Sequence, residues 1–349
     1  MNIIQDTIIN WYEENHRDLP WRHNPTPYQV WLSEIILQQT RVNQGWEYYL
    51  RFIEKWPTVS DLAQASEEEV LKMWQGLGYY SRARNLNKCA RQVVEQHGGQ
   101  FPQDFEQLKQ LQGVGNYTAA AIASIAFGLP HAVIDGNVYR VLARLFDIDT
   151  PININEGQKL FAQLADELLN RNQPGLHNQA MMEFGALHCT PKNPNCLLCP
   201  LQTQCLALAN QTVLQRPVKL AKTKVTIRYF NYLVIRINDS VYLHKRSDND
   251  IWKNLYDFPC IESQKPMTVE EVIASNDFIQ LIENKPFTII KISPILTHKL
   301  THRTILAQFI EIKLEQKLLQ IQTKDLFLAH ETELGSFPIP RLIDLYLNN

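Results

Sequence analysis

Hydrophobic positions change their period along the chain, and this change divides it into two parts. Up to about residue 210, apolar residues recur every three or four positions, as in Leu86-Ala90-Val93 and Leu160-Leu164-Leu168. This spacing places them on one face of a helix. Turn signals such as Gly98-Gly99 and Pro174-Gly175 separate the successive segments. We therefore predict an all-α domain over residues 1–210.

The last third of the chain follows a different pattern. Segments 229–237 and 305–312 are runs of β-branched and aromatic residues, the second partly alternating, which is typical of strands. Helices are expected after Thr268 and after Pro340. We predict a mixed α/β domain over residues 225–349 and, before it, a polar and basic linker over residues 211–224. A chain of 349 residues is long enough for two such domains.

Composition and charge exclude few functions. The chain is 45% hydrophobic and 20% charged, as in ordinary soluble proteins. It starts without a basic segment followed by an apolar core, so we expect no signal peptide. The uncharged, Ala-rich segment 118–134 fits a buried helix and its exit better than a membrane span, and we expect no membrane association. A net charge of −2 means that binding to DNA would need Lys and Arg gathered on one face.

Four cysteines form the densest chemical motif in the sequence. They have the spacing C-x6-C-x2-C-x5-C and are Cys189, Cys196, Cys199 and Cys205. Thiolates this close repel one another unless a metal centre takes up their charge, and an iron–sulfur cluster requires four of them. Structural zinc is an alternative, but it favours paired C-x2-4-C knuckles, and one such pair is present. Disulfides need an oxidising compartment. We therefore favour a cluster.

A second motif is a glycine turn between two helical segments. A predicted helix ending near Leu111 runs into Gly113 and Gly115, and an Ala-rich helix begins at Tyr117. The glycines permit a tight turn, and the free N–H groups of the following helix suit a phosphate. A plain helix hairpin would have the same turn, so this motif alone does not decide between the two.

Asp135 lies downstream of the turn and precedes another predicted helix, so it could serve simply as an N-cap. The glycine turn, this Asp and the four cysteines together resemble the helix-hairpin-helix DNA glycosylases with a [4Fe–4S] cluster, over residues 1–210. The resemblance implies double-stranded DNA as the partner. It also implies that Gly113 and Gly115 contact a DNA phosphate, that Asp135 faces the sugar of a flipped nucleotide with Asn137 beside it, and that the cysteine loop lies against the DNA backbone.

Two positions indicate which members of this family the chain resembles. Members that also cleave the DNA strand carry a Lys just before the hairpin Thr, and its amine forms a Schiff base. Tyr117 occupies that position here, so we expect no lyase activity. Glu34 lies in segment 30–40, which resembles the motif of the A/G-specific adenine DNA glycosylases (the MutY family), as do segments 19–22 and 76–82. An endonuclease III-like lyase and a non-catalytic iron–sulfur DNA-binding protein remain as alternatives.

The chemistry of adenine release explains why two carboxylates are needed. Adenine leaves poorly unless its ring is protonated, so a general acid is required. Apolar neighbours flank Glu34, and a pKa raised by about two units from roughly 4.3, or on the order of 3 kcal/mol, lies within what burial can deliver. Asp135 should stay ionised and face the positive charge that grows on the sugar, as an electrostatic stabiliser or as a nucleophile, while Tyr117 orients the site. A solvated surface position is the alternative for Glu34.

The remaining contacts with DNA come from the resemblance. Base flipping leaves a gap in the duplex, and Gln39, Leu77 and Tyr79 lie in segments that resemble the wedge loops of the family. Trp21, Arg22 and Gln179 are expected to line the adenine pocket. Core packing is the alternative for Leu77 and Trp21, and an ordinary helix surface is the alternative for Gln179.

The C-terminal domain resembles a Nudix domain from segment 251–259 onward. A Glu-rich metal-binding helix is missing, which opposes a Nudix hydrolase. In the family this domain inspects 8-oxoguanine opposite adenine, and Leu300, Thr301 and His302 stand where members often have Phe-Ser-His. A hairpin turn with incidental histidines is the alternative. We expect a monomer that acts on 8-oxoguanine:adenine or guanine:adenine mispairs in the cytoplasm of a bacterium, at the nucleoid.

Overall fold

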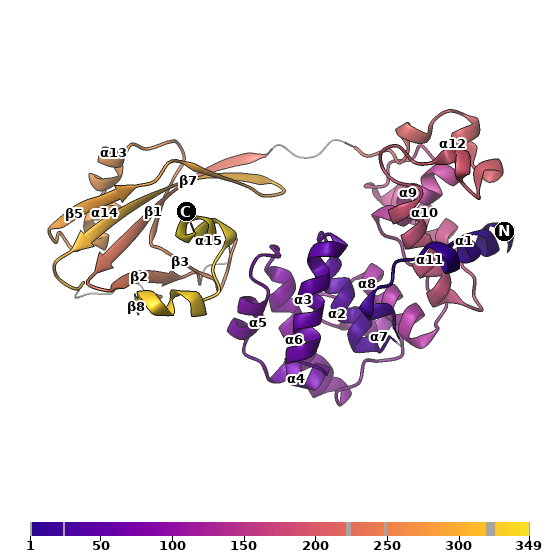
Figure 1. The fold of residues 1–349 in the computed structure, drawn as a ribbon, viewed down its shortest axis with the longest axis horizontal. Helices are drawn as coiled ribbons and strands as arrows, with labels where there is room; N and C mark the ends of the chain where they lie inside the picture. Colours follow the sequence, from indigo (N-terminus) through magenta and orange to yellow (C-terminus); the bar gives the residue numbers. More distant parts are fainter. Residues whose placement is uncertain (1, 24, 221–224, 248–249, 319–324, 349) are drawn as a thin grey trace. The chain divides into compact units, whose positions relative to one another are not determined.

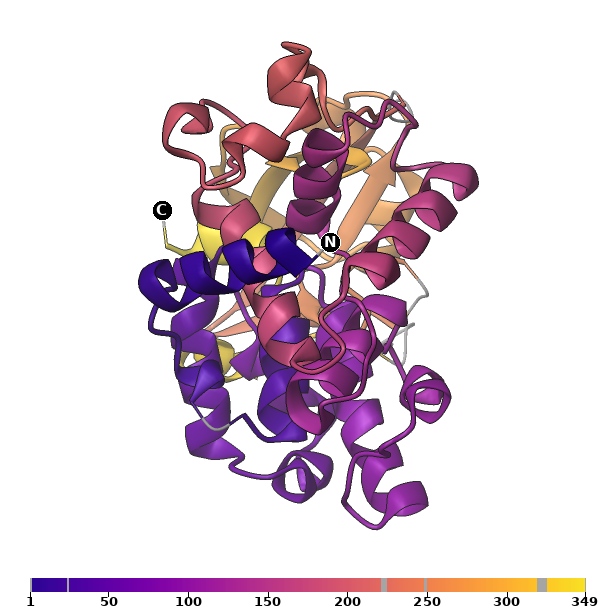
Figure 2. The same cartoon turned by 90° about the vertical axis from the view of Figure 1, so that its right-hand side faces the viewer.

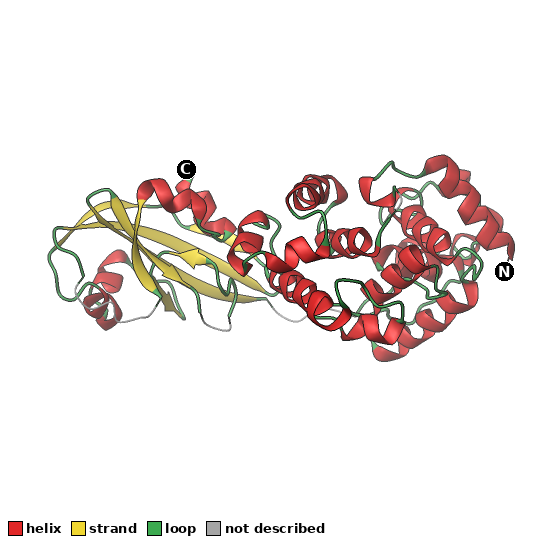
Figure 3. Ribbon diagram, turned by 90° about the horizontal axis from the view of Figure 1, so that it is seen from below, coloured by secondary structure: helices red, strands yellow, loops and turns green. Residues whose placement is uncertain are grey.

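The computed structural model describes the chain except for residues 1, 24, 221–224, 248–249, 319–324 and 349 (Figure 1). The contacts within the chain define two compact units, residues 1–65 with 85–221 and residues 66–84 with 222–349. Helices make up the first unit, and the strands lie in the second (Figure 3). The prediction of an all-α domain followed by an α/β domain is therefore confirmed. Among the described residues, no helix has the length and apolar character that a bilayer span requires.

Short capped helices build the first unit. Thr26 begins α2 with a capping box that includes Gln29, and Asp104 caps α7. α5 (Glu67–Met73) belongs to the second unit, and α6 (Ser81–His97) has residues in both. The other helices are α1 (Asn2–Asn15), α2 (Pro27–Leu37), α3 (Val42–Lys55), α4 (Val59–Gln64), α7 (Phe105–Gln110), α8 (Asn116–Ala121), α9 (Gly136–Leu145), α10 (Asn155–Leu168), α11 (Pro174–Leu187) and α12 (Leu206–Ala209).

One core of the first unit lies where α1, α9, α10 and α11 meet. The N-terminal helix α1, in indigo, packs against α11 (Figure 2). Ile8, Leu142, Phe161 and Phe184 are fully or almost fully buried in this core. Burying a side chain of this size stabilises the fold by roughly 1.5–3 kcal/mol. The core therefore fixes the start of α9 and the inner face of α11, which both border the pocket described below.

The uncharged segment 118–134 forms a buried helix, as predicted, but its geometry changes partway. α8 continues into a π-helical turn, Ile122–Ala126, and the chain then turns at Gly128, which has a φ of 67°. α11 approaches this turn closely at Gly175, where an added Cβ would lie 2.6 Å from the carbonyl oxygen of Ser124. Only a residue without a side chain allows this approach, and the hydrophobic pattern alone gave no indication of the π-helical turn.

The second unit contains a mixed sheet of eight strands. β1 and β7 pair in parallel, with Leu233 opposite Ile310, and the other strand pairs are antiparallel. The main order is β3-β2-β1-β7-β5; β4 pairs with β1, β6 with β7 and β8 with β2. The strands are β1 (Thr226–Ile237), β2 (Ser240–Lys245), β3 (Tyr256–Asp257), β4 (Cys260–Ser263), β5 (Phe287–Ile292), β6 (Leu296–Lys299), β7 (Arg303–Leu314) and β8 (Leu326–His330).

Helices cover both faces of this sheet. Val272 of α13 (Val269–Ile273) and Phe278 of α14 (Asn276–Leu281) pack with Leu233 and Ile310 on one face. On the other face, Tyr346 of α15 (Arg341–Leu347) stacks on Phe309 with ring centroids 4.1 Å apart. Successive strand residues point to opposite faces, which explains why β1 and β7 are apolar on both. The helices predicted after Thr268 and Pro340 are confirmed.

Two segments belong to units in which our predicted boundaries did not place them. α5 and the turn after it pair with the C-terminal residues: Lys72 Nζ donates to the carbonyl oxygen of Phe337 (3.0 Å) and the Tyr80 hydroxyl to that of Ile339 (3.2 Å). Part of the proposed linker pairs with the helical unit instead, because Ile152 N donates to the carbonyl oxygen of Val218 (3.0 Å). Hydrophobic period alone could not assign either segment.

Candidate active site

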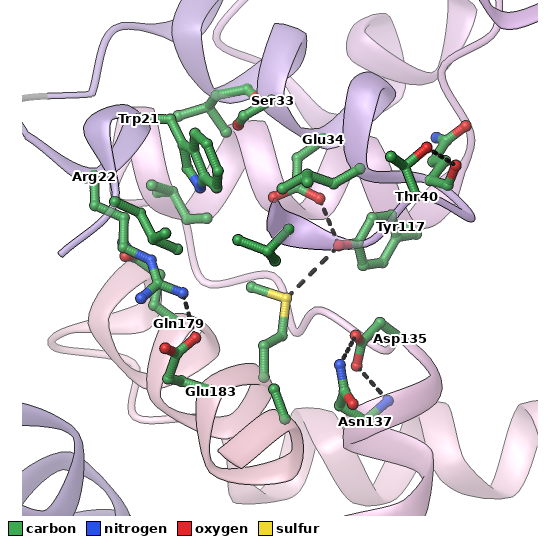
Figure 4. A pocket seen from close by; sticks show the side chains of 18 of the residues that line it. Trp21, Arg22, Ser33, Glu34, Thr40, Tyr117, Asp135, Asn137, Gln179 and Glu183 are labelled. Atoms are coloured by element: carbon green, nitrogen blue, oxygen red, sulfur yellow. Dashed lines mark hydrogen bonds and ion pairs between the residues drawn. The ribbon is translucent and has the colours of Figure 1, made fainter. Parts of the chain in front are cut away.

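A cavity of about 400 Å³ opens in the helical unit between α2, α8, α11 and the start of α9 (Figure 4). It collects residues that lie far apart in the sequence. Both predicted carboxylates, Glu34 and Asp135, line it, and so does Tyr117. The predicted residues on its wall are Trp21, Arg22, Glu34, Gln39, Tyr117, Asp135, Asn137 and Gln179.

Glu34 projects from α2 into this cavity. The neighbouring turns of the helix are packed in the core, with Trp31 and Ile36 fully buried, so the carboxyl group lies in a largely dry setting. Burial raises the pKa of Glu34 to about 7; a hydrogen bond from Tyr117 lowers it and the charge of Asp135 raises it. This agrees with the rise that adenine protonation requires. At neutral pH a substantial fraction of this carboxyl keeps its proton.

Tyr117 contacts Glu34 directly. Its hydroxyl donates to Glu34 Oε2 over 2.5 Å and lies 3.7 Å from the Sδ of Met182 (Figure 4). Burial raises the pKa of Tyr117 well above its usual range, and the nearby carboxylates raise it further. The hydroxyl therefore remains a donor at every working pH. It fixes the orientation of one oxygen of Glu34.

Asp135 is the N-cap of α9. Its Oδ1 accepts from the backbone N–H groups of Asn137 and Val138, both at 2.8 Å, and its Oδ2 accepts from Asn137 Nδ2 at 2.7 Å. The capping role weighed from the sequence is therefore present, and the same carboxyl group also faces the cavity. Burial raises the pKa of Asp135, while these hydrogen bonds and Arg140 lower it. The three donors favour the charged form that we expect for Asp135, and burial acts against it.

Glu183 is a wall residue that the sequence analysis missed. Its carboxylate is almost completely buried and accepts from the guanidinium groups of Arg17 (2.7 Å) and Arg22 (2.7 Å). Burial acts to raise its pKa, but the hydrogen bonds from Arg17 and Arg22 outweigh it and lower the pKa to about 2. Its position one helical turn after Gln179 was a signal, because two polar residues on one face of a largely apolar helix indicate a polar cavity.

The other wall residues come from separate elements. Gln179 Oε1 accepts from the Tyr12 hydroxyl at 3.0 Å. Trp21 lies in the short turn Pro20–Arg22 and packs edge-on against Tyr49, with ring centroids 5.2 Å apart. Trp21 is thus both a core residue and a wall residue, so the two interpretations do not exclude each other.

The glycine turn lies outside this cavity. Gly113 has a φ of 78°, and an added Cβ would meet the Asn85 Cβ at 2.7 Å. Gly115 has an ordinary extended conformation and open space around it, and it is the N-cap of α8. The fold therefore requires a glycine at 113 but gives no reason for one at 115.

Two of the three predicted wedge residues, Leu77 and Tyr79, meet the predicted recognition residues in the second unit. A cavity of about 810 Å³ is lined by residues 76–81 on one side and residues 298–303 on the other, which include Leu77, Tyr79, Leu300, Thr301 and His302. The Tyr79 hydroxyl lies 2.5 Å from Thr301 Oγ1. Tyr79 is 49% exposed, whereas Leu77 is 7% exposed and buried in the protein.

Gln39 resembles Tyr79 in its backbone, although it belongs to the other unit. Both have a left-handed conformation, with φ values of 58° and 49°. A side chain on such a backbone stores strain, which is often found where a residue inserts into a ligand. Gln39 is exposed at the rim of the first cavity.

The four cysteines face one small cavity at the end of the helical unit, beside Arg144. None of the four is in a disulfide, and burial raises the pKa of Cys205. Arg140 Nε and Arg144 Nη1 donate to carbonyl oxygens of the loop, at Cys189 (2.7 Å) and Thr190 (2.7 Å). Two buried arginines of α9 therefore hold the cysteine loop.

Comparison with known proteins identifies the two units. Residues 32–167 match the HhH-GPD superfamily of base excision DNA repair proteins, and residues 231–349 match a NUDIX domain. The adenine DNA glycosylase of Buchnera aphidicola subsp. Baizongia pistaciae (strain Bp) is 34% identical over 308 residues, which cover 87% of this chain and 84% of that protein. The adenine DNA glycosylase of Homo sapiens is 48% identical over 214 residues, 58% of this chain and 39% of that protein.

Solved structures agree with this assignment. A thermostable thymine-DNA glycosylase superposes with a TM-score of 0.56 at 30% identity, over 60% of this chain and 96% of that one. Endonuclease III in a non-covalent complex with DNA superposes with a TM-score of 0.52 at 24% identity, over 60% of this chain and 96% of that one, and shares the fold.

A helix-hairpin-helix unit with two carboxylates in one cavity, followed by a Nudix-like unit, defines a base excision DNA glycosylase. The relative from Buchnera matches across both units and most of its own length. The chain belongs to the adenine DNA glycosylase (MutY) family, which confirms the resemblance drawn from its motifs.

Proposed function

We propose that this DNA N-glycosylase removes adenine paired with 8-oxoguanine or guanine in double-stranded DNA, by acid-catalysed hydrolysis of the N-glycosidic bond. Monofunctional adenine excision in base excision repair follows from its family. The arrangement of Glu34, Tyr117 and Asp135 around one cavity carries the mechanism. The base must leave the stack to reach this cavity, at a cost of a few kcal/mol.

Glu34 is the general acid in this mechanism. Its raised pKa keeps a proton available at neutral pH, and that proton passes to a ring nitrogen of adenine. The C–N bond then breaks, its electron pair leaves with the base, and the sugar becomes positively charged. The deprotonated Glu34 can take a proton from the water that adds to the sugar carbon, which balances the reaction.

Asp135 faces the positive charge that develops on the sugar. Its three hydrogen-bond donors stabilise the carboxylate form. A negative charge held in place before the reaction stabilises the transition state without reorganisation. Asp135 must be ionised both for electrostatic stabilisation and for attack as a nucleophile.

The wall of the cavity supports a monofunctional enzyme. Among the described residues that line it, none is a lysine, and Tyr117 occupies the position where lyase members carry their amine. Borohydride reduces a Schiff base to a stable adduct. We expect no protein–DNA adduct when borohydride is added with abasic DNA; a trapped adduct would favour the lyase alternative.

Recognition of the opposite base is assigned to the second cavity. Tyr79 and Gln39 are exposed and have strained backbones, which suits gap-filling, while Leu77 would first have to leave its buried position. Thr301 and His302 lie on the hairpin that lines the same cavity as Tyr79. Replacing Thr301 and His302 together by Ala should change the ratio of rates on 8-oxoguanine:adenine and guanine:adenine duplexes.

The four cysteines are proposed to hold a [4Fe–4S] cluster. They fit because all four thiols face one cavity and none is in a disulfide. Their spacing contains one C-x2-C pair instead of the two knuckles typical of structural zinc, which favours a cluster over zinc. When bound, the cluster would neutralise the four thiolates and order the loop. Iron and sulfide analysis of the purified protein tests this assignment.

The decisive experiment is adenine release by Glu34→Gln. We expect the single-turnover rate on an 8-oxoguanine:adenine duplex to fall by about 10²–10⁴, the usual contribution of a general acid, while DNA binding stays within a factor of two. Glu13→Gln, on an exposed face of α1, is the matched control. Turnover retained in Glu34→Gln would overturn the mechanism.

A further inference from the structure

Asp250 lies at the centre of an arginine cluster at the base of the recognition hairpin. Its carboxylate accepts from Arg228 (2.7 Å) and Arg303 (3.0 Å), and Arg246 lies 3.5 Å away. The side chain is 29% exposed. Burial acts to raise its pKa, but hydrogen bonds from Arg228, Ile251 and Arg303 lower it to about 2. The carboxylate is therefore ionised at every working pH.

Arg303 depends on Asp250 more than the other two arginines do. Arg228 also pairs with Glu262 (2.5 Å), and Arg246 also pairs with the buried Asp257 (2.8 Å). Among the residues that the structure describes, Asp250 is the acid with which Arg303 forms an ion pair. Removing this carboxylate would release Arg303 and leave Arg228 and Arg246 held.

Arg303 is the residue that closes the recognition hairpin. It directly follows Leu300, Thr301 and His302 and begins β7, and its carbonyl oxygen accepts from Leu300 N at 2.8 Å. Thr226 N donates to the carbonyl oxygen of His302 at 3.1 Å. The Arg303 side chain is 41% exposed and lines the same cavity as the hairpin tip.

We propose that Asp250 is a positioning residue that sets specificity for the base opposite adenine, by holding Arg303 away from the DNA backbone and the hairpin in one conformation. This inference rests on the proposed function of the hairpin. An arginine released at this place would bind phosphate whatever the base, because phosphate contacts carry no sequence information. A loosened hairpin would also lose the fixed geometry that discrimination requires.

The main test compares Asp250→Asn with the parent protein. The ratio of single-turnover adenine release on 8-oxoguanine:adenine over guanine:adenine duplexes should fall about fivefold. Affinity for an undamaged duplex should rise roughly two- to fivefold, and the slope of log K against log[salt] should steepen by about 0.9, the value for one added phosphate contact. If Asp250 only stabilised the fold, Asp250→Asn would slow adenine release on both duplexes and would weaken binding to the undamaged duplex as well.

Arg303→Gln and the double variant test whether the effect of Asp250→Asn acts through Arg303. Arg303→Gln alone should lower the ratio without tightening the undamaged duplex, and adding it to Asp250→Asn should cancel the steeper salt slope. Arg236→Gln is the matched control, because Arg236 also joins two acids of this unit, Glu311 and Glu331, away from the hairpin. Arg236→Gln should change neither the ratio of adenine release rates nor the salt slope of DNA binding.

The outcomes separate the inference from the proposed function. If the parent releases adenine equally from both duplexes, lesion recognition by this hairpin fails; the salt slope of Asp250→Asn still tests the Asp250–Arg303 pair. An unchanged ratio and an unchanged slope in Asp250→Asn would overturn the inference. Hydrogen exchange at Leu300 N–H should speed up in Asp250→Asn, and unchanged exchange would also count against it.

Discussion

Burial raises the pKa of Glu34, and this arrangement costs stability wherever the carboxyl group is ionised in the folded state. Its folded pKa of about 7 lies above the value of an unfolded chain. The folded state therefore binds more protons between pH 4.5 and 7, and stability falls as pH rises through this window. A difference of this size corresponds to as much as about 3 kcal/mol above pH 7.

Glu34→Gln should therefore stabilise the protein at alkaline pH. We expect the free energy of unfolding at pH 8 to rise by about 2–3 kcal/mol, and at pH 5 by less than about 1 kcal/mol. Urea unfolding at both pH values measures this, with Glu13→Gln as the control. An equal effect at both pH values would mean that Glu34 is not protonated in the folded state.

Tyr117 tunes the acid through one hydrogen bond. The bond to Glu34 lowers the pKa of that carboxyl, so Tyr117→Phe should raise it. Because the proposed mechanism needs Glu34 protonated, the alkaline limb of the pH–rate profile should move to higher pH in Tyr117→Phe. Single-turnover rates between pH 5 and 9 measure the limb. A limb that stays in place or moves to lower pH would contradict this account.

Glu183 holds two guanidinium groups at the wall of the cavity. Removing its charge leaves Arg17 and Arg22 partly buried without a partner, so Glu183→Gln should lower the free energy of unfolding by about 2–4 kcal/mol. The exposed pair Arg171–Asp166 offers a control: Asp166→Asn should change it by less than about 1 kcal/mol.

The same ion pairs make stability depend on acid pH. The pKa of Glu183 is lowered to about 2, so its contribution is present above the unfolded value of roughly 4.3 and is lost as pH falls towards 2. Glu183→Gln should therefore lose this part of the acid dependence. An unfolding free energy that keeps the parent's pH dependence below pH 4.5 would contradict the assignment.

Among the elements, the hairpin between α7 and α8 offers a matched pair of glycines. Gly113→Ala forces a left-handed φ on a residue with a side chain and a contact of 2.7 Å with Asn85, and should destabilise the protein by about 1–3 kcal/mol. Gly115→Ala has open space and should leave stability within about 0.5 kcal/mol.

For DNA binding we expect the opposite order: Gly115→Ala, which leaves stability unchanged, should be the variant that weakens binding. If a phosphate approaches the turn at Gly115, the added methyl of Gly115→Ala should weaken binding to duplex DNA about tenfold, and the folded fraction should not change. Fluorescence anisotropy with labelled duplex and urea unfolding together make the test. Full affinity in Gly115→Ala would remove the turn from the DNA interface.

On the scale of the whole molecule, the proposed function places adenine cleavage and opposite-base recognition in different units. Every residue that lines the first cavity lies within residues 1–221, while the second cavity needs residues 250–303. A chain ending at residue 221 should still release adenine from guanine:adenine duplexes, and its preference for 8-oxoguanine should approach one. A preference equal to that of the full chain would place recognition in the helical unit.

Segment 66–84 shows why such a truncation has a second effect. It carries Leu77 and Tyr79, and its hydrogen bonds include those to the carbonyl oxygens of Lys253, Phe337 and Ile339. Without those partners the wedge residues lose their support. The absolute rate of adenine release by the truncated chain should therefore fall as well, because the truncation removes both the second cavity and the partners of segment 66–84.

Features that depend on near neighbours could be predicted from the chain. The helical and strand periods, the caps at Thr268 and Asp135, and the spacing of the cysteines all depend on residues within one or two turns. The absence of Schiff-base chemistry could be predicted as well, because it depends on the identity of one side chain, Tyr117 in place of Lys. The amino-acid sequence alone thus determined the two domain types, and its motifs pointed to Glu34 and Asp135 as candidate carboxylates.

Through-space relations needed the folded chain. Tyr117 meets Glu34 across 83 positions, Arg17 meets Glu183 across 166, and Arg303 meets Asp250 across 53. The pKa of a carboxyl depends on every charge and apolar group within a few ångströms, whatever their order in the sequence. Only tertiary structure decided that burial raises the pKa of Glu34 while two arginines lower that of Glu183, because burial and ion pairing follow distance in space.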